Sequence, residues 1–157
     1  MRKSEDAAKH SPIARPGGIT ELVQTYSCPH PLTHGIIHIK PDGAGEMMTF
    51  DGDYRPGSGR ATKFRLRLTT GEAAGLFAYL AGSGYETLPE RYDPYPPPER
   101  TCIDCCSGSI EVKTARGSKR ISYMGEYKDP RVEELIKGID AALSGHAWEE
   151  FKYPWER

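Results

Sequence analysis

Short stretches of the chain alternate between apolar and polar residues, which is the pattern of β-strands that bury one face. The clearest example is Phe64, Leu66 and Leu68, which alternate with basic residues over positions 63–68, so that one face enters a core and the other meets water. Two further pairs of stretches flank glycine-containing turns, and each pair predicts a β-hairpin. These pairs are 35–40 with 46–50, and 109–114 with 119–124.

The chain before the first hairpin is less regular. Its apolar residues, Ile19, Leu22, Val23 and Tyr26, do not alternate strictly, and we interpret the segment as a leading strand in preference to a short helical turn. The segment 28–34 contains two prolines, which predict a loop.

Two later stretches have the period of amphipathic helices. Thr69 and Glu72 have the spacing of a capping box that opens the first helix. Asp129 and Pro130 begin the second helix, because Asp is a favoured N-cap and Pro is tolerated at the first helical position. Gly145 ends that helix. The expected core consists of Leu76, Phe77, Leu80, Leu135, Ile136 and Ile139 packed against Phe64, Leu66, Ile110 and Val112.

Strand pairs interrupted by one helix and closed by another predict an α+β fold, with an antiparallel sheet of about five strands and two helices packed on one face. At 157 residues the chain has the length of one domain. We divide it into a flexible N-terminal arm at 1–18, a single α+β domain at 19–145 and an aromatic C-terminal tail at 146–157. The proline-rich segment 89–100 predicts an exposed loop, because proline lacks the backbone donor that a helix or central strand needs.

Composition and charge exclude some classes of partner. The 21 basic and 22 acidic residues nearly cancel, so no overall field attracts nucleic acid or an anionic membrane. Arg60, Lys63, Arg65 and Arg67 form a basic strand face, but no aromatic residues are interleaved with them, as a nucleic-acid platform would require. The chain has no apolar run long enough for a signal peptide or a membrane span. We therefore expect a cytoplasmic protein that binds neither nucleic acid nor membranes.

A cysteine cluster is the sharpest chemical feature of the sequence. Cys102 and Cys105 form a Cys-x-x-Cys pair, and this spacing lets two thiolates meet one tetrahedral zinc ion. Cys106 adjoins them. The other ligands would come from Cys28, His30 or His34, which lie on the proline-rich loop. A cytoplasmic chain favours thiols or a metal site over disulfides. Two interpretations stay open: a set of buried or paired cysteines, and a structural zinc site.

His38 is expected to project from the first hairpin on the face opposite Ile37 and Ile39, as a solvated or hydrogen-bonded residue. The C-terminal tail holds both tryptophans of the chain. Large aromatic residues dominate interface hot spots, so the tail either folds back over the sheet, which we favour, or docks on a partner. The candidate partner-binding residues are Trp148, Phe151, Tyr153 and Trp155. Because Pro154 breaks a helix, we expect a short helical extension followed by an extended hook.

Catalytic motifs are absent from the sequence: it has no nucleophile elbow, phosphate-binding loop, zinc-protease helix or dinucleotide fingerprint. The order of predicted elements over residues 19–143 resembles small bacterial domains of unknown function, loosely including emfourin-type inhibitors of metalloproteases. Those inhibitors usually carry an acidic residue before their penultimate hairpin, and this chain departs from that pattern because its Asp104 lies inside the cysteine cluster. The resemblance implies a non-catalytic interaction or regulatory domain, with an inhibitor-like binder as one form. The alternative is a small zinc-binding protein that uses the cysteine cluster.

Overall fold

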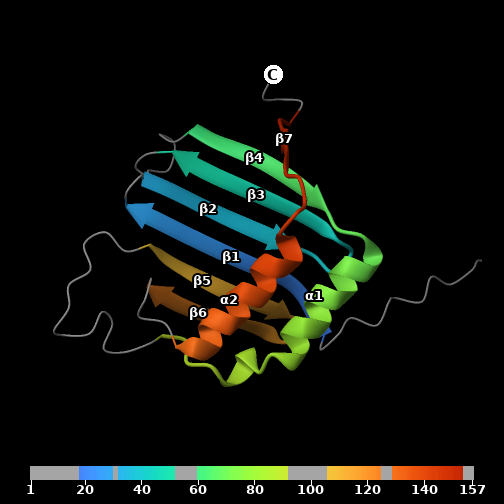
Figure 1. The fold of residues 1–157 in the computed structure, drawn as a ribbon, viewed down its shortest axis with the longest axis vertical. Coiled ribbons are helices and arrows are strands. Elements are labelled where there is room, and N and C mark those ends of the chain that lie inside the picture. Colours follow the sequence, from blue (N-terminus) through green and yellow to red (C-terminus); the bar gives the residue numbers. More distant parts are fainter. Residues whose placement is uncertain (1–17, 30–31, 52–59, 92–105, 125–128, 154–157) are drawn as a thin grey trace, which may run out of the picture.

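The computed structural model describes residues 18–29, 32–51, 60–91, 106–124 and 129–153. It is an α+β fold with one seven-stranded antiparallel sheet, and the strand order is β6-β5-β1-β2-β3-β4-β7. Both helices lie in front of the same face of the sheet (Figure 1). The predicted fold class is therefore confirmed, whereas the expected number of strands was too low. No helix among these residues is long and apolar enough to cross a membrane.

The sheet consists of a four-stranded meander, one further hairpin and a returning tail. β1 (Ile19–Pro29) is an interior strand, and it pairs with β2 (Leu32–Ile39) and β5 (Ser107–Thr114). The remaining strands are β3 (Ala44–Asp51), β4 (Arg60–Arg67), β6 (Gly117–Met124) and β7 (Glu149–Phe151). The leading strand is thus confirmed. The loop expected at 28–34 is wrong for most of its length, because a proline removes only its own donor and the ladder runs up to the Pro29–Leu32 pair.

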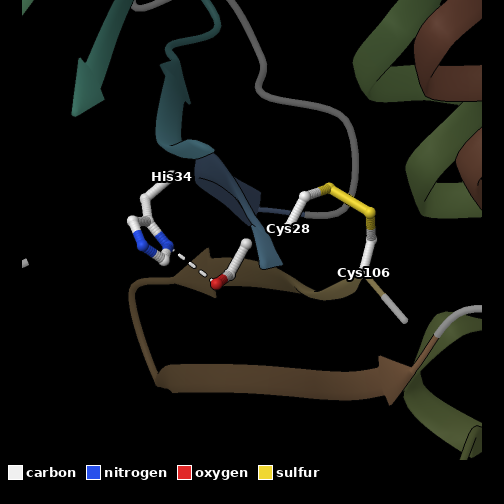
Figure 2. The surroundings of a disulfide bond; sticks show 4 residues. Cys28, His34 and Cys106 are labelled. Carbon is white, nitrogen blue, oxygen red and sulfur yellow. Dashed lines mark hydrogen bonds between the residues drawn. A yellow bond between two sulfur atoms is a disulfide. The ribbon is translucent and has the colours of Figure 1, made fainter. Parts of the chain in front are cut away.

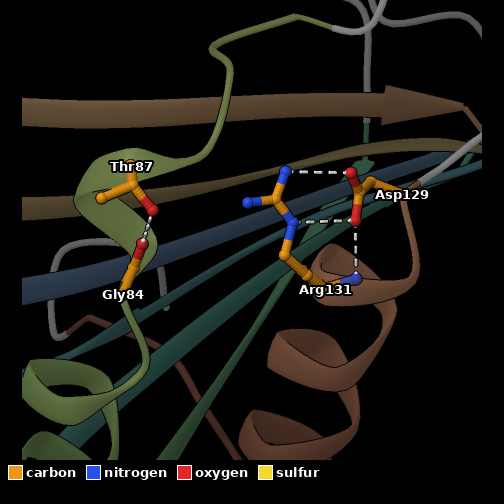
Figure 3. Close-up of polar contacts among 4 residues, drawn as sticks. All are labelled: Gly84, Thr87, Asp129 and Arg131. Carbon is orange, nitrogen blue, oxygen red and sulfur yellow. Dashed lines mark hydrogen bonds and ion pairs between the residues drawn. The ribbon is translucent and has the colours of Figure 1, made fainter.

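Both helices begin where their capping residues predict. In α1 (Thr70–Gly82) the Glu72 N–H donates to Thr69 Oγ1 at 3.2 Å, and the Thr69 N–H donates to Glu72 Oε2 at 2.8 Å. α2 (Pro130–Leu143) starts at Asp129, whose Oδ1 accepts the Arg131 N–H at 2.8 Å. The Arg131 guanidinium also contacts both carboxylate oxygens (Figure 3). These hydrogen bonds hold the pKa of Asp129 below its usual value.

A 3-10 turn, η2 (Tyr85–Thr87), follows α1 and turns the chain toward the sheet. The Thr87 hydroxyl donates to the Gly84 carbonyl at 2.9 Å (Figure 3). Gly84 has a φ of +74°, which glycine adopts without strain. The turn buries Tyr85 and Leu88 in the main core.

The core lies between the two helices and the sheet, and most of its predicted members are buried there. Two residues that were expected to be buried are buried only in part. Ile136 is partly buried at the margin of the core, and the fully buried residue of that helical turn is Ile139. Phe64 is half-buried, because it lies on β4, toward the edge of the sheet.

Candidate functional site

The second face of the sheet is the candidate functional surface. Residues that pair across an antiparallel sheet share a face, and Leu22, Ile39 and Leu66 mark the face that packs on the helices. The alternate residues of every strand point to the other side. Neither described helix packs on that side (Figure 1), which we call the open face.

A row of charged side chains crosses the open face from one edge of the sheet to the other. Successive pairings join its members. This charge row, in strand order from β6 to β7, is Arg120, Glu111, Val23, His38, Glu46, Arg65 and Glu149. Val23 is buried within it, so its longer neighbours cover the apolar position. The row gives the open face a fixed order of charges.

Glu21 lies beside the charge row and joins β1 to both of its neighbours. Its carboxylate contacts Lys113 Nζ at 2.8 Å and His38 Nδ1 at 3.0 Å. Burial favours the neutral acid, but hydrogen bonds from Lys113 and His38 outweigh it and hold the pKa of Glu21 below its usual value. The pKa of Lys113 is raised by its hydrogen bond to Glu21. His38 therefore projects opposite Ile37 and Ile39 and is hydrogen-bonded, as predicted.

Hydroxyl groups gather at the other end of the open face. The Thr25 and Ser109 hydroxyls lie 2.6 Å apart, and Ser27 Oγ lies 2.7 Å from His34 Nδ1. This hydroxyl cluster, which also includes Ser107 and Ser122, lines a shallow hollow of about 350 Å³ that Arg120 borders. Hydroxyls act as both donors and acceptors, so the hollow suits polar groups of a partner.

A disulfide joins Cys28 at the end of β1 to Cys106, just before β5, with Cα atoms 4.2 Å apart (Figure 2). The bond closes a loop between residues 78 apart in sequence. Side-chain alternation places it on the face opposite Ser27. The sequence favoured free thiols or a metal site over a disulfide, and this expectation is wrong for Cys28 and Cys106. Their pairing was not visible in the sequence, because β1 and β5 become neighbours only in the folded sheet.

The predicted zinc ligands are only partly described. Cys28 and Cys106 share the disulfide, and His34 is hydrogen-bonded to Ser27. His30, Cys102 and Cys105 lie outside the described residues. Within the part of the chain that the structure describes, no three His, Cys, Asp or Glu side chains are grouped to hold a metal ion. A zinc site therefore stays a prediction.

The aromatic tail folds back onto its own domain, as favoured, but by a different route. Residues 146–153, the part of the tail that the structure describes, form no helical extension, because Gly145 turns the chain with a φ of +79° and β7 pairs with the edge of β4. Trp148 packs against the core, as predicted. Trp155 lies outside the described residues.

Two cations of β4 lie over aromatic rings of the returning tail. Arg65 Cζ lies 5.5 Å from the centre of the Phe151 ring, and Lys63 Nζ lies 4.4 Å from the centre of the Tyr153 ring. The two rings meet edge to face with centroids 5.4 Å apart. Cation–π contacts contribute about 0.5–1 kcal/mol each at exposed sites, so these residues hold the tail to the sheet.

Sequence reasoning missed the charge row, the hydroxyl cluster and the Glu21 contacts. A signal for the cluster was present, because Thr25 and Ser27, like Ser107 and Ser109, stand two positions apart in strands. It could not be used without the pairing of β1 with β5, which brings together residues more than 80 positions apart.

Comparison with known proteins adds no family to this picture. No model of a protein family matches the chain, and no curated protein matches it significantly. The resemblance to emfourin-type inhibitors therefore stays a prediction.

Proposed function

We propose that the protein is a non-catalytic interaction domain that binds a protein partner through the open face of its sheet. The observation that carries this proposal is the one-sided packing of the fold: both helices lie on one face of a sheet that has seven strands. The opposite face is built from side chains of all these strands.

The composition of the open face supports this proposal. Val23, Ile36, Met48 and Phe50 form its middle, and each is buried or half-buried. The charge row crosses this apolar middle and ends at exposed Arg120 and Glu149, while the hydroxyl cluster lies toward the β6 edge. Protein–protein interfaces likewise combine buried apolar contacts with charged and hydrogen-bonding groups.

Site-specific photo-crosslinking in living cells tests this proposal. A benzoylphenylalanine at Ile36 or Met48, on the open face, should give discrete crosslinked adducts. Matched controls at Ala78 of α1 and Ala141 of α2, both exposed on the helix side, should not. Equal crosslinking from all four positions, or none from the open face, would overturn the proposal.

The sequence also suggested inhibition of a thermolysin-like metalloprotease, and this is a narrower form of the same proposal. It predicts that the purified protein lowers the protease's activity and that Met48→Arg relieves the inhibition. The zinc alternative predicts bound metal in protein purified without chelator. A sample without zinc would remove that alternative.

The disulfide bears on localisation. Disulfides persist in oxidising compartments and are rare in the cytosol, so the Cys28–Cys106 bond favours an oxidising compartment over the cytoplasm expected from the sequence. Thiol labelling of protein trapped with acid directly from cells tests this: the oxidised form should predominate.

A further inference from the structure

We propose that the partner of the open face is a second copy of this chain, packed face to face about a twofold axis that runs along β2 between the two sheets. This inference rests on the proposed function, because it takes the open face to be an interface. Three observations support it: the place of β2 in the sheet, the order of charges in the charge row, and the area of the open face.

The first observation is the place of β2 in the sheet. It is the fourth of the seven strands, so three strands lie on each side of it. A twofold axis along β2 places each strand of one copy opposite a strand of the second copy. The two strands lie equally far from β2, on opposite sides of it. β6 then faces β7 of the second copy, β5 faces β4, and β1 faces β3. This rotation also turns a twisted sheet onto its own shape, so two sheets of the same hand nest.

The second observation is the order of charges. Under this axis Arg120 faces Glu149 of the partner subunit, and Glu111 faces Arg65 of the partner subunit, because these residues share the charge row. Each contact forms twice by symmetry. Opposite charges thus meet at four places across the interface.

The remaining rows fit the same axis. Ile36 lies on the axis and faces its own copy. Thr25 faces Met48 of the partner subunit, and Ser27 faces Phe50 of the partner subunit. His38 also lies on the axis and faces its own copy, and Val23 faces Glu46 of the partner subunit. The centre of the interface therefore combines apolar and polar side chains. Lys113 faces Arg67 of the partner subunit, and Glu21 at 2.8 Å offsets the charge of Lys113.

The third observation is the size of the face. With strands about 4.8 Å apart and same-face residues about 6.8 Å apart along a strand, four rows across the sheet cover roughly 600 Å² per copy. The total of about 1,200 Å² is at the lower end for specific complexes. We therefore expect a reversible dimer whose population depends on concentration.

Charge reversal with complementation tests the proposal by sedimentation velocity. Glu111→Arg and Arg65→Glu each put like charges opposite each other twice, so each variant should weaken the dimer by more than about ten-fold. In an equimolar mixture, the new Arg faces the new Glu and the unchanged Arg65 faces the unchanged Glu111. The mixture should recover heterodimers, which a merely misfolded variant cannot form. Glu134→Arg, on the exposed side of α2, is the control and should leave the dimer unchanged.

Three results would overturn the inference: a wild-type protein that stays monomeric at every concentration, a dimer that both reversals leave intact, and variants that are monomeric but do not recover in the mixture. Crosslinking separates this failure from that of the proposed function. Adducts from Ile36 to a different protein keep the open face as an interface and reject the second copy. If neither Ile36 nor Met48 gives adducts, both the open face as an interface and the second copy as its partner are rejected.

Discussion

Glu21 is the residue whose ionisation most directly couples the open face to stability. Hydrogen bonds from Lys113 and His38 lower its pKa in the folded protein from the ordinary value of 4.5, whereas the unfolded chain keeps the ordinary value. The folded state thus binds the proton less tightly than the unfolded state. The contact stabilises the fold above pH 4.5, and this stability is lost as the pH falls through the lower folded pKa.

Replacing Glu21 by Gln should therefore lower the free energy of unfolding near neutral pH, by about 1 kcal/mol for a partly exposed ionic hydrogen bond. The difference from wild type should shrink as the pH falls below 4.5. Thermal unfolding over a series of pH values measures this. Glu134→Gln, on the exposed face of α2, should give a small difference at every pH. A Glu21→Gln difference that persists in acid would contradict the linkage.

At the scale of elements, the contact between the two helices depends on a glycine. Tyr79 of α1 lies against Gly138 of α2, and its hydroxyl donates to the Glu134 carbonyl at 2.9 Å. A methyl group at Gly138 would collide with the Tyr79 ring. Ala normally stabilises a helix interior by about 1 kcal/mol over Gly, so we expect Gly138→Ala to lose this gain.

The matched control is Gly75→Ala in α1, where an added methyl meets nothing within 4 Å and should raise the free energy of unfolding by about 1 kcal/mol. Denaturant titration compares the two variants. In a Tyr79→Ala background the collision is gone, so Gly138→Ala should then stabilise as well. An equal gain at both glycines in the wild-type background would show that the tyrosine contact contributes nothing.

The short strand β7 depends on Trp148, which anchors the tail to the core just before the strand begins. We expect Trp148→Ala to cost about 2–3 kcal/mol, less than for a fully buried tryptophan. It should also release β7, so amide exchange in β4 should quicken at residues 63–65, which pair with β7. Lys152→Ala, in the same tail and exposed, should change neither quantity. Unchanged exchange in the Trp148 variant would mean that the cation–π contacts alone hold the tail.

At the scale of the whole molecule, the Cys28–Cys106 disulfide ties the middle of the sheet together across 78 positions of sequence. Closing a loop of this length removes unfolded-state entropy worth about 4.5 kcal/mol. Reductant should lower the melting temperature of the wild-type protein and leave that of the Cys28→Ser/Cys106→Ser variant unchanged. A wild-type melting temperature insensitive to reductant would mean that the bond adds no net stability.

Local structure was largely predictable from the sequence. The capping box at Thr69, the Asp129 and Pro130 helix start and the hairpin strands depend on residues a few positions apart, and each was confirmed. The burial of Leu76, Leu135 and Ile139 followed from helical period alone. These features form because neighbouring residues meet their own hydrogen-bonding and burial needs.

The candidate site could not be predicted in the same way, because its residues come together only through strand pairing. The hydroxyl cluster needs β1 beside β5, and the charge row needs the order of all seven strands. β7 has only three residues, too few to show an alternating pattern in the sequence. It forms because the edge of β4 offers unpaired backbone groups. The sequence by itself therefore determined both helices, most of the strands and their buried faces, through local periodicity and capping. The tertiary structure alone decided which polar faces meet, because pairing between distant strands follows from the register of the whole sheet.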